Sequence, residues 1–184
     1  THVSNVLGTV NPIEQICAWA RKAGISTVID GSQAAPHRPV DIPALGCDFY
    51  AFTGHKLCGP TGTGGLWAKR EHWQSMPPFF GGGEMIREVR FEKTTFNDPP
   101  HKFEAGTPNI AGFVGLGAAV DYLSAIGMSD IENREHALLT YATERLQTID
   151  GLRIIGTAQH KAAVLSFLVD GAHAHDLATL LDLE

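Results

Sequence analysis

The sequence predicts an α/β fold in which part of a mostly parallel sheet is followed by the start of a smaller α+β domain. Over residues 1–30, short apolar, β-prone runs flank an amphipathic helical pattern, and the links between them are short. This strand–helix–strand order predicts a right-handed parallel βαβ unit. Beyond Gly127 the expected order is helix, strand, strand, helix, which no longer fits a doubly wound sheet. We therefore expect residues 1–127 and residues 128–184 to belong to two domains.

The N-terminal part is expected to begin with a strand over residues 1–7. Asn11 and Pro12 then have the pattern of a helix start, with Asn as the N-cap and Pro at the first helical position. Gly24 is expected to end this helix. Residues 27–30 are short, apolar and β-prone, and predict a buried strand that ends at Asp30.

The centre of the chain is a lysine in a glycine-rich turn between two strand-like runs, residues 48–52 and 66–68. If the apolar flanks bury Lys56, desolvation would lower its pKa and free the amine as a nucleophile. Alternatively, the segment is a tight turn and Lys56 points outward. Cys58, two positions later, is interpreted as a bystander in the turn. The glycines that follow match neither a Walker loop nor a dinucleotide fingerprint.

Three polar groups follow the ends of predicted strands, namely Asn5, Asp30 and residues 53–56. In open α/β sheets, ligands bind outside the carboxyl ends of the strands. We therefore expect these groups to converge on one crevice. For Asp30 itself two interpretations stay open: a cap of the following turn, or a carboxylate that faces a cationic ligand atom, with Gln33 beside it.

The second half predicts mostly helices. Residues 89–96 are expected to form a strand or hairpin arm, and Asn109 is expected to start a helix that ends at Gly127 and is buried between layers. Ser129 predicts a capping box for an amphipathic helix that runs to about residue 149. Strands are expected over residues 152–155 and 164–169, and a helix over 175–184. The inward face of the helix after Ser129 is expected to hold Ile131, Leu138, Tyr141, Ala142 and Ile149.

The histidines near the C-terminal end suggest either a metal site or a helix cap. His173 and His175 are separated by one residue and followed by Asp176, but no third ligand has comparable spacing. Capping of the last helix is therefore the simpler interpretation.

Charge and cysteine content point away from several classes of partner. The 184 residues carry 14 basic and 20 acidic side chains, a net charge of −6, so nucleic acid is not expected as a partner. No apolar run is long enough to span a bilayer, so no membrane is expected either. Three cysteines without a metal-type spacing indicate reduced thiols and a cytoplasmic location.

Both ends suggest a piece of a longer protein. Thr1 lies in what reads as a strand already under way, and Glu184 lies inside a helical pattern. We therefore expect a central fragment.

Four separated motifs together resemble the group II, SufS-like cysteine desulfurases, which are pyridoxal-phosphate enzymes of the class V aminotransferase superfamily. They are Asp30-x-x-Gln33 and the stretches TGHKLCGPTG (53–62), GGGEMI (81–86) and FEAGTPN (103–109). The resemblance covers nearly the whole chain, with the motifs in the family's order. It implies an aspartate-aminotransferase-like large domain, a small α+β domain and a homodimer.

The resemblance also implies roles around the cofactor. Lys56 would bind pyridoxal phosphate as a Schiff base and act as general base and acid. Asp30 would pair with the pyridinium nitrogen, and Gln33 would bond the phenolic oxygen. Asn5 would orient the cofactor and the substrate carboxylate.

The phosphate would be held by three further residues. Thr53 and His55 would hold it within one subunit, and Thr107 would reach the phosphate of the neighbouring subunit. By this resemblance, L-cysteine would yield L-alanine and an enzyme persulfide. The sulfur would then pass to a SufE- or SufU-like acceptor for iron–sulfur cluster assembly.

Departures from the family pattern leave alternatives. None of Cys17, Cys47 and Cys58 aligns with the family's persulfide cysteine, which would lie beyond Glu184, so the isolated chain is expected to be inactive. A selenocysteine lyase, or another class V lyase or epimerase, is the alternative enzyme. A non-catalytic module for dimerisation or partner binding is the alternative of another class, motivated by the predicted hairpin at residues 88–96.

Overall fold

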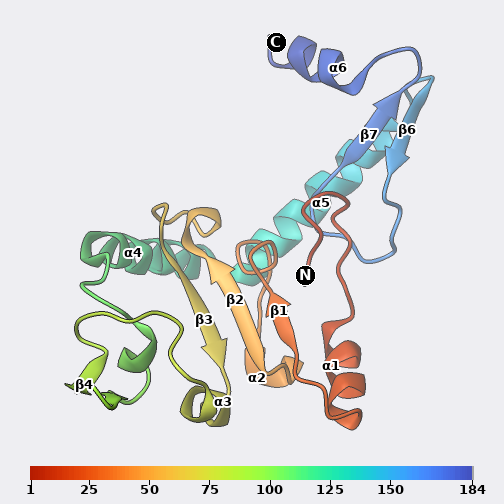
Figure 1. Ribbon diagram of the computed structural model, residues 1–184. Helices are drawn as coiled ribbons and strands as arrows, with labels where there is room; N and C mark the ends of the chain where they lie inside the picture. The colour runs from red at the N-terminus through yellow and green to blue at the C-terminus, as the bar shows by residue number, and fades with distance from the viewer. Residues whose placement is uncertain (184) are drawn as a thin grey trace.

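A computed structural model describes residues 1–183, and it has an extended shape (Figure 1). One body holds a three-stranded sheet with its helices. The long helix α5 (Met128–Leu146) leads from this body to a second hairpin, β6 (Leu152–Ile155) and β7 (Ser166–Val169), and to the helix α6 (Ala174–Leu181). The sheet-bearing body carries most of the residues singled out above.

The main sheet has the order β1-β2-β3, formed by β1 (Val28–Asp30), β2 (Phe49–Thr53) and β3 (Gly64–Ala68). The expected parallel pairing is confirmed for β1 and β2, in which Asp30 lies opposite Ala51. By contrast, β3 runs antiparallel to β2, so the sheet within the described residues is mixed.

The strand expected over residues 1–7 is wrong. Val3 and Val10 form only an isolated bridge, and the chain turns between them. The Ser4 hydroxyl accepts hydrogen bonds from the amides of Val6 and Leu7, at 3.3 and 3.1 Å, which favours a turn over an extended strand. The expected βαβ unit therefore lacks its first strand.

The first helix, α1 (Ile13–Lys22), begins after Pro12 and not as predicted. The Asn11 side chain does not cap it, because its amide donates to the carbonyl oxygen of Thr1 at 2.8 Å. Ile13 and Cys17 pack into the core below the sheet together with Ile29, Leu45, Cys47 and Tyr50. Burial of this apolar face against the sheet, rather than a cap, explains the position of α1.

Short elements surround the sheet. They are α2 (Ile42–Leu45), the 3₁₀ turn η1 (Gly54–Lys56), α3 (Arg70–Ser75), β4 (Ile86–Val89), β5 (Thr94–Phe96) and the 3₁₀ turn η2 (His101–Phe103). The hairpin expected near residues 88–96 is present, but a strand over 89–96 is wrong. The amide of Arg90 donates to the carbonyl of Lys93, so the chain turns between β4 and β5.

Helix α4 (Ile110–Ile126) begins as predicted, because the side-chain Oδ1 of Asn109 accepts from the amide of Gly112 at 3.0 Å. The expected burial between layers is wrong for this chain. One stripe, Gly112, Leu116, Ala119 and Leu123, is buried, whereas neighbours such as Val114 are exposed.

The prediction of a capping box at Ser129 is also wrong, since α5 begins at Met128 directly after Gly127, whose φ is +94°. A left-handed glycine lets α4 and α5 follow each other with a bend of 70°. Of the residues expected to face inward, Leu138, Tyr141 and Ile149 are exposed. Within residues 1–183 no single helix is long and apolar enough to cross a membrane, although the bent pair α4 and α5 passes that test together.

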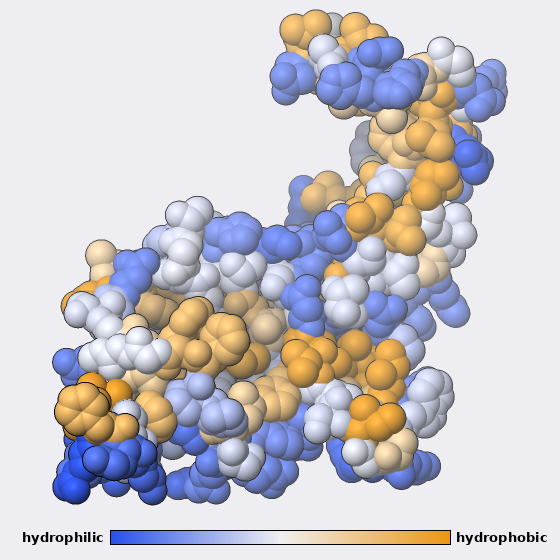
Figure 2. All heavy atoms as spheres, in the orientation of Figure 1, coloured by the Kyte–Doolittle hydropathy of each residue, from blue (hydrophilic) through white to orange (hydrophobic). Residues whose placement is uncertain are grey.

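The last elements match the prediction closely. Both strands of the β6–β7 hairpin form, and the His173 ring accepts from the amide of His175 at 3.3 Å, which confirms the capping interpretation for α6. Apolar side chains gather on the surface over this hairpin (Figure 2).

Candidate functional site

The site lies at the carboxyl ends of the parallel strands β1 and β2. Asp30 is the last residue of β1, and the next amide, that of Gly31, donates to the carbonyl of Ala51 at 2.8 Å. Thr53 ends β2, and η1 follows it directly with His55 and Lys56. Asp30 and residues 53–56 thus lie at the ends of two neighbouring parallel strands, as expected, while their convergence with Asn5 on one crevice stays a prediction.

The Asp30 carboxylate is held in its charged form. Its Oδ1 accepts from the Ser32 amide at 2.9 Å, so the turn-capping interpretation is correct. The hydrogen bonds from Ser32 lower the pKa of Asp30 below its ordinary value, and the positive charge of Lys56 lowers it further. Capping and an electrostatic role are therefore compatible, because the cap stabilises the anion.

Backbone hydrogen bonds fix the turn that carries Lys56. The amide of Gly54 donates to the carbonyl of Thr63 at 2.8 Å, and the amides of Leu57 and Gly59 both donate to the carbonyl of Gly54. A Cβ on Gly54 would lie 2.0 Å from the Thr63 hydroxyl, so a larger residue does not fit there. Lys56 itself is exposed, which agrees with the outward alternative and not with burial.

Thr53 and His55 form a polar pair beside the lysine. The Thr53 hydroxyl and His55 Nδ1 are 2.8 Å apart, and the His55 side chain is exposed. A hydroxyl and an imidazole at the start of a turn can both donate to an anion such as a phosphate.

The other predicted residues lie at different distances from the carboxyl ends of β1 and β2, which we call the strand-end edge. Gln33 is half-buried in the loop after β1, and its Nε2 is 3.5 Å from His37 Nε2. Asn5 is exposed in the N-terminal turn, which approaches the end of β1 because the amide of His2 donates to the carbonyl of Asp30 at 2.7 Å. Thr107 is exposed in the loop before α4, and within residues 1–183 no hydrogen bond joins it to Asp30 or Lys56.

Sequence reasoning missed the residues that support this edge. His2 Nδ1 is 3.0 Å from the Tyr50 hydroxyl, and both side chains are buried. His37 Nδ1 is 2.8 Å from Glu135 Oε1 on α5. Because these partners are 48 and 98 positions apart, no local pattern could have paired them.

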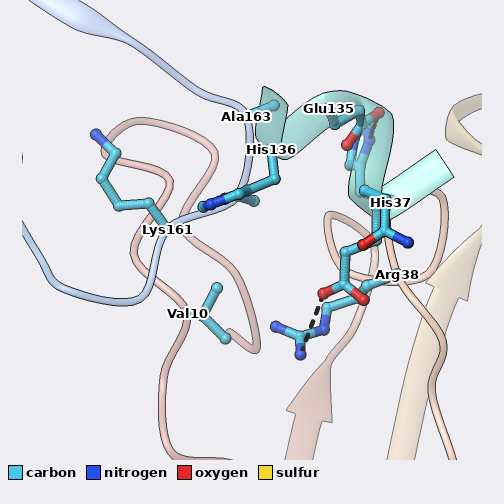
Figure 3. A pocket seen from close by; sticks show the side chains of 10 residues that line it. Val10, His37, Arg38, Glu135, His136, Lys161 and Ala163 are labelled. Carbon is cyan, nitrogen blue, oxygen red and sulfur yellow. Dashed lines mark hydrogen bonds and ion pairs between the residues drawn. The ribbon is translucent and has the colours of Figure 1, made fainter. Parts of the chain in front are cut away.

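A hollow of about 230 Å³ lies beside His37 (Figure 3). It is lined by charged side chains from α5 and from the loop after β1, together with Lys161. Burial lowers the pKa of Lys161, whose Nζ donates to the carbonyl of Gly156 at 2.7 Å. The hollow does not include Asp30 or Lys56, so it is not the edge site itself.

The edge site offers a chemically distinctive set of groups. It holds a carboxylate, a primary amine, and a hydroxyl paired with an imidazole at the ends of two neighbouring strands. Such a set fits a ligand that has a cationic ring nitrogen, an electrophilic carbonyl carbon and a phosphate.

Comparisons with known proteins give consistent results. The sequence matches the family described as aminotransferase class-V over residues 1–184. A protein of Xylella fastidiosa named as a probable cysteine desulfurase is 72% identical over 184 residues, which are 100% of this chain and 44% of that protein. This chain thus spans less than half the length of the curated relatives it matches.

Comparison of the fold with solved structures gives a similar result. The cysteine desulfurase CsdA of Escherichia coli matches with a TM-score of 0.94 and 40% identity, over 99% of this chain and 45% of CsdA. Two structures of C-DES, a cystine C–S lyase, match with a TM-score of 0.87 and 25% and 26% identity, over 99% of this chain and 50% of theirs. One contains glycine covalently linked to the pyridoxal-phosphate cofactor, and the other contains the reaction product cysteine persulfide.

Proposed function

Because this chain belongs to the class-V aminotransferase family, we propose that the protein containing it is a pyridoxal-phosphate-dependent cysteine desulfurase. The observation that carries the proposal is the placement of Asp30 and Lys56 at the carboxyl ends of two paired parallel strands, Asp30 as the last residue of β1 and Lys56 in the turn that follows β2. The fold match to CsdA supports the same reaction. We also propose that residues 1–127 and 128–184 belong to a large and a small domain.

Each proposed cofactor contact uses the chemistry of its side chain. Asp30 would hold a proton on the ring nitrogen, and Gln33 would donate to the phenolic oxygen. Thr53 and His55 would bind the phosphate, and the contact of 2.8 Å between the Thr53 hydroxyl and His55 Nδ1 holds the two side chains together. Lys56 would carry the covalent link, because its exposed amine is accessible to a ligand from solution. Bound pyridoxal phosphate supplies an electron sink that stabilises negative charge on the substrate's α-carbon.

Lys56 has a second proposed role as a general base and acid. Its amine takes and returns a proton at the α-carbon of the amino acid. Asn5 orients the substrate carboxylate, and Thr107 reaches the phosphate of a neighbouring subunit in a homodimer.

The proposed overall reaction needs no outside oxidant. A thiol and L-cysteine give a persulfide and L-alanine: the C–S bond of the substrate breaks, and its sulfur bonds to the attacking sulfur. Within this chain Cys17 and Cys47 are buried, and the exposed Cys58 does not align with the family's persulfide cysteine, so we propose that the attacking cysteine lies elsewhere in the full-length protein. A SufE- or SufU-like acceptor for iron–sulfur cluster assembly and a cytoplasmic location complete the proposal.

The test is an assay of the full-length protein with L-cysteine. We expect equal amounts of alanine and transferred sulfur, and a loss of turnover of about 100-fold or more in Lys56→Ala. A protein that binds no pyridoxal phosphate, or that makes alanine equally well without Lys56, would contradict the proposal.

A related lyase is the second candidate, and the C-DES match favours it over an epimerase. A cystine lyase would release cysteine persulfide from cystine. A selenocysteine lyase would prefer L-selenocysteine over L-cysteine. Product analysis with the three substrates in parallel separates these possibilities.

A further inference from the structure

One imidazole connects the Gln33 side chain to helix α5. Gln33 Nε2 lies 3.5 Å from His37 Nε2, and His37 Nδ1 lies 2.8 Å from Glu135 Oε1. All three residues are half-buried. In Figure 3 the side chains of His37 and Glu135 lie together at the wall of the hollow. A continuous polar chain thus runs from the loop after β1 to a helix beyond the Gly127 bend.

The chemistry of the end groups fixes the direction of these hydrogen bonds. A carboxylate can only accept, so the Glu135 contact requires the proton of His37 to be on Nδ1. In the neutral ring, Nε2 then carries a lone pair and can only accept. With the ring neutral, the group that Gln33 presents is its amide nitrogen, which donates one N–H to His37.

This arrangement leaves the second N–H of Gln33 for a ligand. An amide turned the other way would present its carbonyl oxygen to the ligand, and two acceptors would then face each other across the contact. Polar partners behind a contacting side chain hold its orientation in this manner in many sites.

We propose that His37 and Glu135 are positioning residues that orient the Gln33 amide toward the phenolic oxygen of pyridoxal phosphate. The inference rests on the proposed function, in which Gln33 contacts that oxygen. It makes α5 part of the support for the cofactor site, although α5 contributes no group to the strand-end edge itself.

The chain provides a matched control one turn away on the same helix. Arg38 Nη2 is 3.5 Å from Glu132 Oε1, so this pair also joins the loop after β1 to α5. Glu132 is not in the Gln33–His37–Glu135 chain. A change at Glu132 therefore tests docking of the helix without removing the partner of His37.

The experiment uses the full-length protein and the variants Glu135→Gln, His37→Asn and Glu132→Gln. The imidazole nitrogens are followed by ¹⁵N NMR in the cofactor-free protein, and the signals lost in His37→Asn assign His37. We expect the Nδ1–H form in the wild type and in Glu132→Gln, and a mixture in Glu135→Gln, because an amide can donate as well as accept.

Binding of pyridoxal phosphate is the second readout. In Glu135→Gln and His37→Asn we expect an affinity about 3- to 10-fold weaker and a shifted absorption maximum of the bound cofactor. Glu132→Gln should stay within about twofold of the wild type. If the wild type binds no pyridoxal phosphate, the proposed function fails. If it binds normally and Glu135→Gln matches it in tautomer, affinity and spectrum, this inference alone is wrong.

Discussion

The Nδ1 atom of His2 and the hydroxyl of Tyr50 lie 3.0 Å apart in the buried layer that supports the end of β1. The amide of His2 also donates to the carbonyl of Asp30. Burial raises the pKa of Tyr50 to about 12, and burial together with the charge of Arg38 lowers that of His2 to about 4. At neutral pH the tyrosine hydroxyl and a neutral imidazole therefore share this hydrogen bond, and the pair carries no charge.

Removal of this hydroxyl should destabilise the protein. Tyr50→Phe leaves the buried His2 nitrogen without its partner, which costs about 1–3 kcal/mol of the free energy of unfolding. Tyr122→Phe is the control, since Tyr122 is 59% exposed. Urea unfolding of the full-length protein measures both, and a Tyr50→Phe variant as stable as the control would contradict the finding.

The same pair predicts a pH dependence of stability. His2 binds a proton in the unfolded chain below its ordinary pKa of 6.5, but in the folded chain only below about 4. The contribution of neutral His2 to the free energy of unfolding is therefore complete above pH 6.5. It is lost as the pH falls toward 4, by up to roughly 3 kcal/mol. Unfolding midpoints of the wild type and of His2→Gln across this range check the prediction. If the unfolding midpoint changes equally with pH in the two proteins, His2 is not responsible for the pH dependence.

Gly31 should not tolerate a side chain. A Cβ at this position would lie 2.0 Å from the ring of Tyr50, so Gly31→Ala must displace the ring or the loop after Asp30. We expect a loss of about 1–3 kcal/mol in stability and weaker binding of pyridoxal phosphate. Gly117→Ala in α4 is the control, because within residues 1–183 nothing lies within 4 Å of its added Cβ. Thermal unfolding and cofactor titration of both variants decide the matter.

Asp48 should be the main polar residue that holds the amino ends of β1 and β2 together, a role that we call the Asp48 clamp. Its carboxylate accepts from Lys69 at 2.6 Å and from the amide and hydroxyl of Thr27 at 2.8 and 3.0 Å. Burial alone would raise its pKa, but these bonds, with one from His72, hold it well below the ordinary value. Asp48→Asn should lower the free energy of unfolding by about 2 kcal/mol. Asp98→Asn, in an exposed ion pair, should change it by under about 0.5 kcal/mol, and equal losses would refute the clamp.

The sequence predicted those elements whose signals are local. Asn109 caps α4 because its own side chain reaches an amide three positions later, and Asp30, Thr53 and Lys56 lie at one end of the sheet because β1 and β2 are parallel. Such relationships are contained in residue spacing and strand order.

The failures have two physical origins, because either a tertiary contact or a neighbouring backbone turn replaced the structure that the pattern predicted. Asn11 donates to Thr1 instead of capping α1, and Gly127 bends the chain so that Ser129 falls inside α5. The pairing of His37 with Glu135 depends on how α5 lies against the loop after β1. No periodicity reports such a contact between distant segments.

The most direct test of the central claim is the location of the cofactor. The full-length protein is loaded with pyridoxal phosphate, reduced with borohydride, digested, and its peptides are analysed by mass spectrometry. We predict a phosphopyridoxyl group on Lys56, the amine that follows the end of β2. A label on another lysine, or no covalent label, would contradict the account.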